Sequence, residues 1–144
     1  MEVTEQKITL NQLFILLQFH SGINQQKIAE KTGISKSQLS YNIKTGFKTL
    51  GSIKRIFKGL EIPFSVKYKD FVLEEFQALT FSKLVYLSTG INKKEAAGKL
   101  GFKYGTFKQV LKSENIKIKD LKKYFALTGQ KFNIVFNNQI YFIK

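Results

Sequence analysis

The sequence predicts a mainly α-helical protein with short β-strands, built as two tandem copies of a module in which four helices precede a β-hairpin. Three observations carry this prediction. The second half of the chain repeats the first at a fixed offset of 68 residues. Apolar residues recur at helical spacing through most of each copy and alternate with polar residues near its end. Apolar residues also make up 43% of the 144-residue chain, which is enough to form a buried core.

The repeat needs no gap. Eleven positions are identical in the two copies, including the run Gly22-Ile23-Asn24, which is matched by residues 90–92. Other positions change identity but stay apolar, as Leu39 and Phe107 do. Because apolar positions keep their character, we expect residues 1–73 and 74–144 to fold alike, as two units.

Start and stop signals delimit the helices of the first copy. Asn24 and Ser35 are N-cap residues, and Gly33 closes the second helix in the left-handed conformation that glycine tolerates. In the second copy, Glu74 and Glu75 are expected to begin the first helix, where their charge complements the helix dipole. In the first copy the signals predict a helix ending near Gly22 and further helices over 25–32, 36–45 and 50–60.

Alternating apolar residues near the end of each copy predict strands over 64–68 and 132–136. Lys69-Asp70 and Asn137-Asn138 suit tight turns into return strands, so each copy is expected to end in a hairpin. The two first strands need their edges covered, and pairing with each other would achieve this. That arrangement predicts a monomer with pseudo-twofold symmetry, and a homodimer is the alternative.

The charge favours a polyanionic partner. The chain has 24 basic and 10 acidic side chains, a formal net charge of +14, and both copies carry a basic excess. A field of this size attracts nucleic acid above all. No cysteine is present, no apolar run is long enough to cross a membrane, and the N-terminus lacks signal-peptide order. These features predict a cytoplasmic protein without a membrane partner.

Residues 25–40 carry the functional prediction. Ala29 in the middle of one helix allows the next helix to cross closely, and Gly33 turns the chain between them. Ile34 and Leu39 are placed to hold the pair together. This pattern is typical of a helix-turn-helix, and helical geometry places four side chains of its second helix outward: Ser37, Ser40, Tyr41 and Lys44.

The same residues resemble the helix-turn-helix domains of the phage repressor and Cro class, the xenobiotic-response-element type. The resemblance covers residues 10–62 and, more weakly, 78–129. It implies that the third helix enters the major groove of DNA and that the start of the second helix holds a phosphate. By position, Gln25 is then the phosphate contact, and Lys36, Ser37 and Tyr41 contact bases.

The second copy departs from this pattern. Lys103 replaces the capping serine, Gly105 lies inside the expected recognition helix, and Lys93 stands where the first copy has Gln25. We therefore expect the first copy to read sequence and the second mainly to supply charge or a partner surface. Candidate nucleic-acid contacts in the second copy are Lys93, Lys103, Lys108, Gln109 and Lys112.

No catalytic triad, phosphate-binding loop or metal-ligand spacing occurs, and His20 is the only histidine. We expect neither an enzyme nor a metal or cofactor site. The leading hypothesis is a DNA-binding transcriptional regulator of phage or mobile-element type, with double-stranded DNA as its partner. A basic inhibitor or adaptor of anti-defence type, which binds RNA or a nucleoprotein enzyme, is the second hypothesis. A purely structural interaction module is the third.

Overall fold

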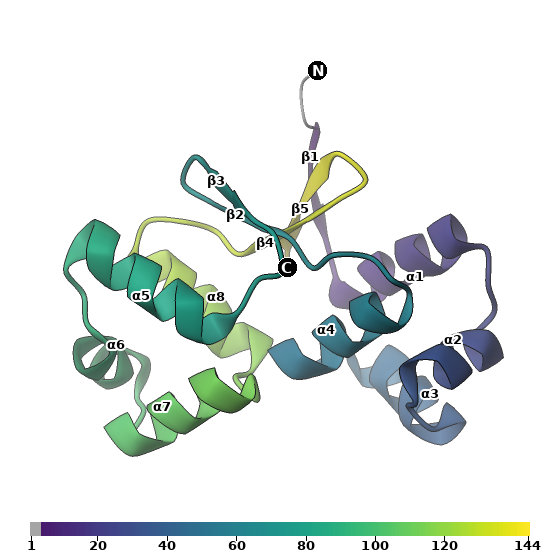
Figure 1. Ribbon diagram of the computed structural model, residues 1–144, viewed down its shortest axis with the longest axis horizontal. Helices are drawn as coiled ribbons and strands as arrows, with labels where there is room; N and C mark the ends of the chain where they lie inside the picture. Colours follow the sequence, from purple (N-terminus) through teal and green to yellow (C-terminus); the bar gives the residue numbers. More distant parts are fainter. Residues whose placement is uncertain (1–3) are drawn as a thin grey trace.

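The computed structural model describes residues 4–144 and is mainly helical, with short strands in small sheets (Figure 1). In chain order, the sequence of four helices followed by two strands occurs twice. The helices of the first half are α1 (Leu10–Ser21), α2 (Gln25–Thr32), α3 (Lys36–Thr45) and α4 (Leu50–Gly59). Those of the second half are α5 (Ala78–Thr89), α6 (Lys93–Leu100), α7 (Tyr104–Ser113) and α8 (Ile118–Leu127). The strands are β1 (Thr4–Ile8), β2 (Val66–Tyr68), β3 (Phe71–Leu73), β4 (Asn133–Phe136) and β5 (Gln139–Ile143).

The bounds predicted for α2 and α3 match the structure, because the expected caps form. The side chains of Asn24 and Ser35 accept hydrogen bonds from the backbone N–H groups of Lys27 and Gln38. Gly33 ends α2 with a φ of 71°, in the left-handed region.

The structure differs locally from the prediction in two places. Strand β1 was not expected, and it pairs in parallel with β5 at the other end of the chain. Helix α5 begins only at Ala78 and has no acidic residue in its first turn, so Glu74 and Glu75 do not start it. The carboxylate near its first turn comes instead from Glu114, which accepts a hydrogen bond from the Ala78 N–H at 3.3 Å.

The strands form two small sheets that meet at one bridge. Antiparallel pairs join β2 to β3 and β4 to β5, and β1 extends the second sheet in the order β1-β5-β4. Between the sheets, the Val135 N–H donates to the Ser65 carbonyl at 2.8 Å. The Asn133 side chain continues this contact, because it accepts from the Lys67 N–H and donates to the Lys67 carbonyl. Segments 64–68 and 132–136 thus lie side by side.

A second set of backbone hydrogen bonds joins the loop before α4 to the loop before α8. The Leu50 N–H donates to the Ile116 carbonyl at 3.0 Å, and the Ile118 N–H donates to the Lys48 carbonyl at 2.7 Å. Thr49 and Lys117 face each other between these bonds. The Lys54 ammonium and the Glu114 carboxylate, 2.7 Å apart and largely shielded from solvent, add an ion pair across the same contact.

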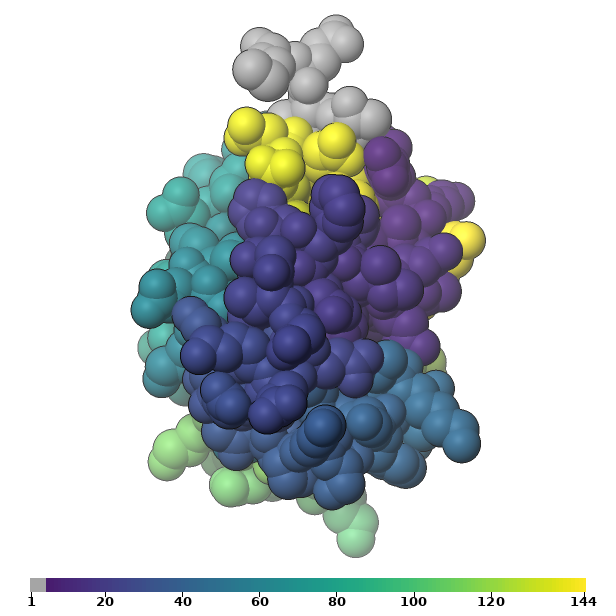
Figure 2. Space-filling model, turned by 90° about the vertical axis from the view of Figure 1, so that its right-hand side faces the viewer, coloured from purple at the N-terminus to yellow at the C-terminus, as the bar shows by residue number. Residues whose placement is uncertain are grey.

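One continuous hydrophobic core runs through both halves. Figure 2 shows the side that the first-half helices cover, with the yellow C-terminal hairpin above them and green atoms of the second half at the lower edge. The core is richest in aromatic rings in the second half, where Phe81 stacks on Phe125 with ring centroids 4.3 Å apart. Burial, and to a lesser degree the neighbouring Tyr68, raise the pKa of Tyr124, whose hydroxyl lacks a hydrogen-bond partner among the described residues.

Candidate nucleic-acid interface

Helices α2 and α3 form a tightly held pair. Ile28, Ala29, Ile34 and Leu39 are buried between them and the rest of the core. The connecting turn is held from α4 by Arg55, the only arginine in the sequence. Its guanidinium donates to the carbonyls of Thr32 and Gly33, both at 3.1 Å. These bonds satisfy carbonyls that the end of a helix leaves without partners, so Arg55 has a structural role in the turn.

Close packing fixes how α4 crosses α2. A Cβ added to Gly59 would lie 2.4 Å from the Cγ2 atom of Thr32, closer than carbon atoms can approach. Only glycine therefore permits this crossing without movement of the neighbouring chain. The crossing sets the position of the α2–α3 turn relative to the core.

The predicted contacts of the first half all lie on the surface. Along α3, Leu39 is buried and Ile43 half-buried, so the opposite face of the helix points to solvent. Tyr41, the largest side chain on that face, is 55% exposed. The exposed residues are Gln25 at the start of α2 and Lys36, Ser37, Ser40, Tyr41 and Lys44 on α3.

The second half presents a face of different chemistry. Lys103 precedes α7 without making a side-chain cap, and Lys93 at the start of α6 is half-buried. The Lys108 ammonium lies over the Tyr104 ring, 4.8 Å from its centroid. The exposed candidates here are Lys103, Lys108, Gln109 and Lys112.

The two sets of residues stay separate but lie at the same edge of the molecule. In Figure 1, α3 and α7 occupy the lower edge on either side of α4, and the strands lie at the opposite edge. The structure thus gathers the α2–α3 candidates on one side and the α6–α7 candidates on the other. It forms no single pocket from all of them.

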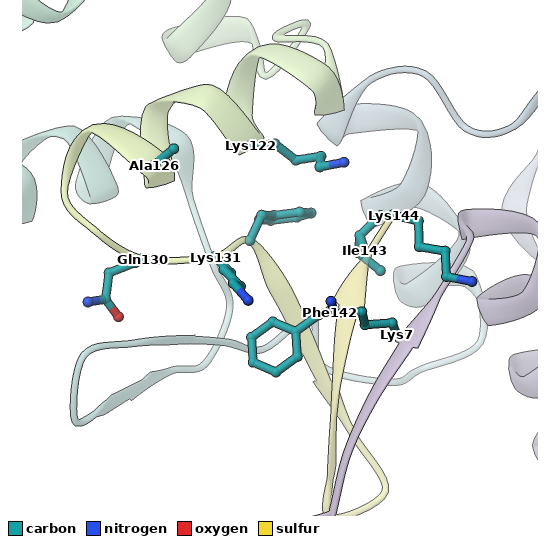
Figure 3. A pocket seen from close by; sticks show the side chains of 9 residues that line it. Lys7, Lys122, Ala126, Gln130, Lys131, Phe142, Ile143 and Lys144 are labelled. Carbon is teal, nitrogen blue, oxygen red and sulfur yellow. The ribbon is translucent and has the colours of Figure 1, made fainter.

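The structure contains a lysine-lined pocket of about 380 Å³ between α8, β5 and β1 that the sequence did not predict (Figure 3). Lys7, Lys122, Lys131 and Lys144 surround it, with Phe142 and Ile143 between them. No ion pair links these lysines to a carboxylate among the described residues. The residues come from both ends of the chain and from α8, so no linear pattern marks them as a group.

Residues 4–144 contain no cluster of three or more histidine, cysteine or acidic side chains placed to hold a metal ion. In the same range, no helix combines the length and the apolar character needed to cross a membrane. No family model, curated protein or solved structure matches the chain.

Proposed function

We propose that the protein binds nucleic acid, preferably double-stranded DNA, through α3 and α7, and acts as a transcriptional regulator of the phage or mobile-element kind. The proposal treats residues 1–73 and 74–144 as tandem helix-turn-helix units of the repressor and Cro type, each ending in a β-hairpin. It implies a cytoplasmic protein that is neither an enzyme nor dependent on a cofactor. The observation that carries it is the symmetry of the contacts between the two halves.

In a contact between units related by an approximate twofold axis, a bond can have a mate with the partners exchanged. The Leu50 N–H donates to the Ile116 carbonyl, and the Ile118 N–H donates to the Lys48 carbonyl. The donors are 68 positions apart and so are the acceptors, so the two bonds are mates. Thr49 and Lys117, which face each other between these bonds, are themselves 68 positions apart. The bond from the Gly51 N–H to the Glu114 carbonyl has no such mate among the described residues, so the symmetry of the contact is approximate.

The strand contact supports the same symmetry. Exchanging the partners of the Ser65–Val135 bridge at the offset of 68 gives Lys67 and Asn133, and the Lys67 N–H donates to the Asn133 side chain. Two separate contacts between equivalent segments support a pseudo-dimeric monomer. Such a monomer presents two recognition helices to one duplex, as dimers of this class do.

Each side of this arrangement has a distinct role in the proposal. On α3, Ser37, Ser40 and Tyr41 offer the varied polar groups that discriminate base edges. On α7, Lys108 and Lys112 offer ammonium groups that attract phosphates with little discrimination. Gln25 and Lys93, at the starts of α2 and α6, lie where the resemblance places phosphate contacts.

Salt dependence tests the proposal. Each phosphate that a lysine neutralises releases a condensed counterion, so the logarithm of the affinity should fall linearly and steeply as the logarithm of the salt concentration rises. The measurement is fluorescence anisotropy on a duplex selected from a random pool, with RNA of the same sequence as competitor. We expect DNA to outcompete RNA. A flat salt response would contradict nucleic-acid binding, and preferential RNA binding would contradict the assignment to DNA.

One observation favours a second candidate function, that of a basic adaptor that binds a nucleoprotein enzyme. Phe19 on α1 and Leu87 on α5 are 88% and 80% exposed, and they occupy equivalent positions in the two halves. Contiguous exposed apolar side chains are typical of protein-binding surfaces, and Ile15, one helical turn before Phe19, is also exposed. Phe19→Ser should leave DNA affinity unchanged under the leading proposal and should abolish binding to the partner enzyme under this one.

A further inference from the structure

A pocket of about 610 Å³ lies where the end of α5 meets the starts of α6 and α7. Two tyrosines line it, Tyr86 from α5 and Tyr104 from α7, and they are 54% and 40% exposed. Lys93 and Lys94 line it from the first turn of α6. The volume falls within the range of small-ligand sites, roughly 300 to 1,000 Å³.

The equivalent positions of the first half carry different chemistry. At an offset of 68, Gln18 and Lys36 stand in place of Tyr86 and Tyr104. Gln25 and Gln26 stand in place of Lys93 and Lys94, and Ile15 stands in place of Lys83. Both aromatic rings and three of the cations at the pocket are therefore specific to the second half. These differences lie beside α7, which the sequence predicts to supply charge rather than read bases.

The lining suits a ligand that is flat and apolar at one end and anionic at the other. Exposed tyrosine rings provide stacking surfaces for nucleobases. Lys83, Lys93 and Lys94 form no ion pair within residues 4–144, so their charge is available to an anion. The ammonium of Lys108, over the Tyr104 ring, adds a further cation close to the wall of the pocket. A nucleotide has this combination of base and phosphate.

We propose that this pocket holds one unpaired nucleotide of a nucleic-acid strand, with the base against Tyr86 and Tyr104 and the phosphate beside Lys93 and Lys94. This inference rests on the proposed function, because Tyr104 begins the helix that we assign to the DNA. It gives the second half a role beyond supplying charge. A strand with a displaced or extrahelical base would be bound more tightly than a fully paired duplex.

The test compares a fully paired duplex with the same duplex carrying an unpaired 2-aminopurine at successive positions. We expect at least one unpaired position to raise the affinity about tenfold, the size of effect that base–aromatic stacking provides. The 2-aminopurine emission should fall on binding at that position. Tyr86→Ala should abolish both effects and leave affinity for the paired duplex within about twofold, because Tyr86 lies on α5, outside the helices assigned to the duplex.

Two control variants make the test specific. Tyr86→Phe with Tyr104→Phe keeps the rings and should keep the preference, whereas Gln18→Ala, at the matched position of the first half, should change nothing. Equal affinity for paired and unpaired duplexes, or a preference that survives Tyr86→Ala, would overturn the pocket assignment. If free 2-aminopurine ribonucleoside monophosphate abolished the preference at micromolar concentration, the ligand would be a free nucleotide instead. Failure of the wild-type protein to bind any duplex would overturn the proposed function itself.

Discussion

The two halves of the molecule follow the same order of helices but begin those helices differently. In the first half, each of the four helices starts with a side chain that accepts a hydrogen bond from the first turn. Among the four described helices of the second half, only α6 has such a cap. The capping residues of the first half are Thr9, Asn24, Ser35 and Thr49, and their counterparts in the second half are Gln77, Asn92, Lys103 and Lys117.

The hydrophobic cores of the two halves also differ, but here it is the second half that has the additional contacts. Around α8, Phe81 contacts both Phe125 and Tyr124, with ring centroids 4.3 and 5.1 Å apart. The position equivalent to Phe81 in the first half is Leu13, which is buried but not aromatic. Side-chain caps in the first half and aromatic packing in the second half therefore stabilise the same order of helices in different ways. In the second half, two cap positions are occupied by lysines, which add to the positive charge.

The aromatic core gives the largest expected effect. Phe81→Ala should lower the free energy of unfolding by about 4 kcal/mol, and Leu13→Ala by about 3 kcal/mol, because the larger side chain leaves the larger cavity. Urea unfolding followed by circular dichroism measures both variants. If Leu13→Ala had the larger effect, the second half would not depend on aromatic packing as described.

Two glycine substitutions are expected to change stability with opposite signs. Gly59→Ala should destabilise the protein by about 1–2 kcal/mol, because the new methyl group collides with Thr32. Gly98→Ala should stabilise it by about 0.5–1 kcal/mol, because a Cβ there meets no atom within 4 Å and alanine favours a helix. The midpoints of thermal unfolding should therefore move apart. A shift in the same direction for both variants would contradict the close α2–α4 crossing.

The caps give a smaller pair of effects. Ser35→Ala removes the side-chain cap of α3 and should cost about 1 kcal/mol of stability. Lys103→Ser introduces the missing cap at α7 and should add a few tenths to about 1 kcal/mol. Chemical denaturation midpoints are sensitive enough to detect both changes. No gain from Lys103→Ser would mean that the start of α7 is stabilised by another interaction.

The ends of helices were predictable where the residues that determine them are neighbours in the sequence. Asn24, Gly33 and Ser35 define the ends of α2 and the start of α3, and each acts within one helical turn. The exposed face of α3 followed from the burial of Leu39, because helical geometry alone places its other residues.

Long-range features were not predictable in this way. The sequence of β1, with Glu5 and Lys7 exposed, gives no strand signal, and its partner β5 lies at the far end of the chain. Glu114 contacts both Lys54 and the start of α5, and nothing near it in sequence indicates either partner. The pocket beside Tyr86 and Tyr104 also needs three helices, so only the fold brings its residues together.

The central claim is that both halves bind one duplex but contribute unequally. The most direct test measures affinity and its salt dependence for Ser37→Ala with Tyr41→Ala, and for Lys108→Glu with Lys112→Glu, on a selected and a scrambled duplex. We predict that the first variant loses discrimination between the duplexes, because it removes contacts to base edges. The second should weaken binding to both duplexes by a similar factor and reduce the salt slope by about 2, one for each lost phosphate contact. Equal loss of discrimination in both variants would contradict the division of roles, and no loss in either would contradict base reading by α3.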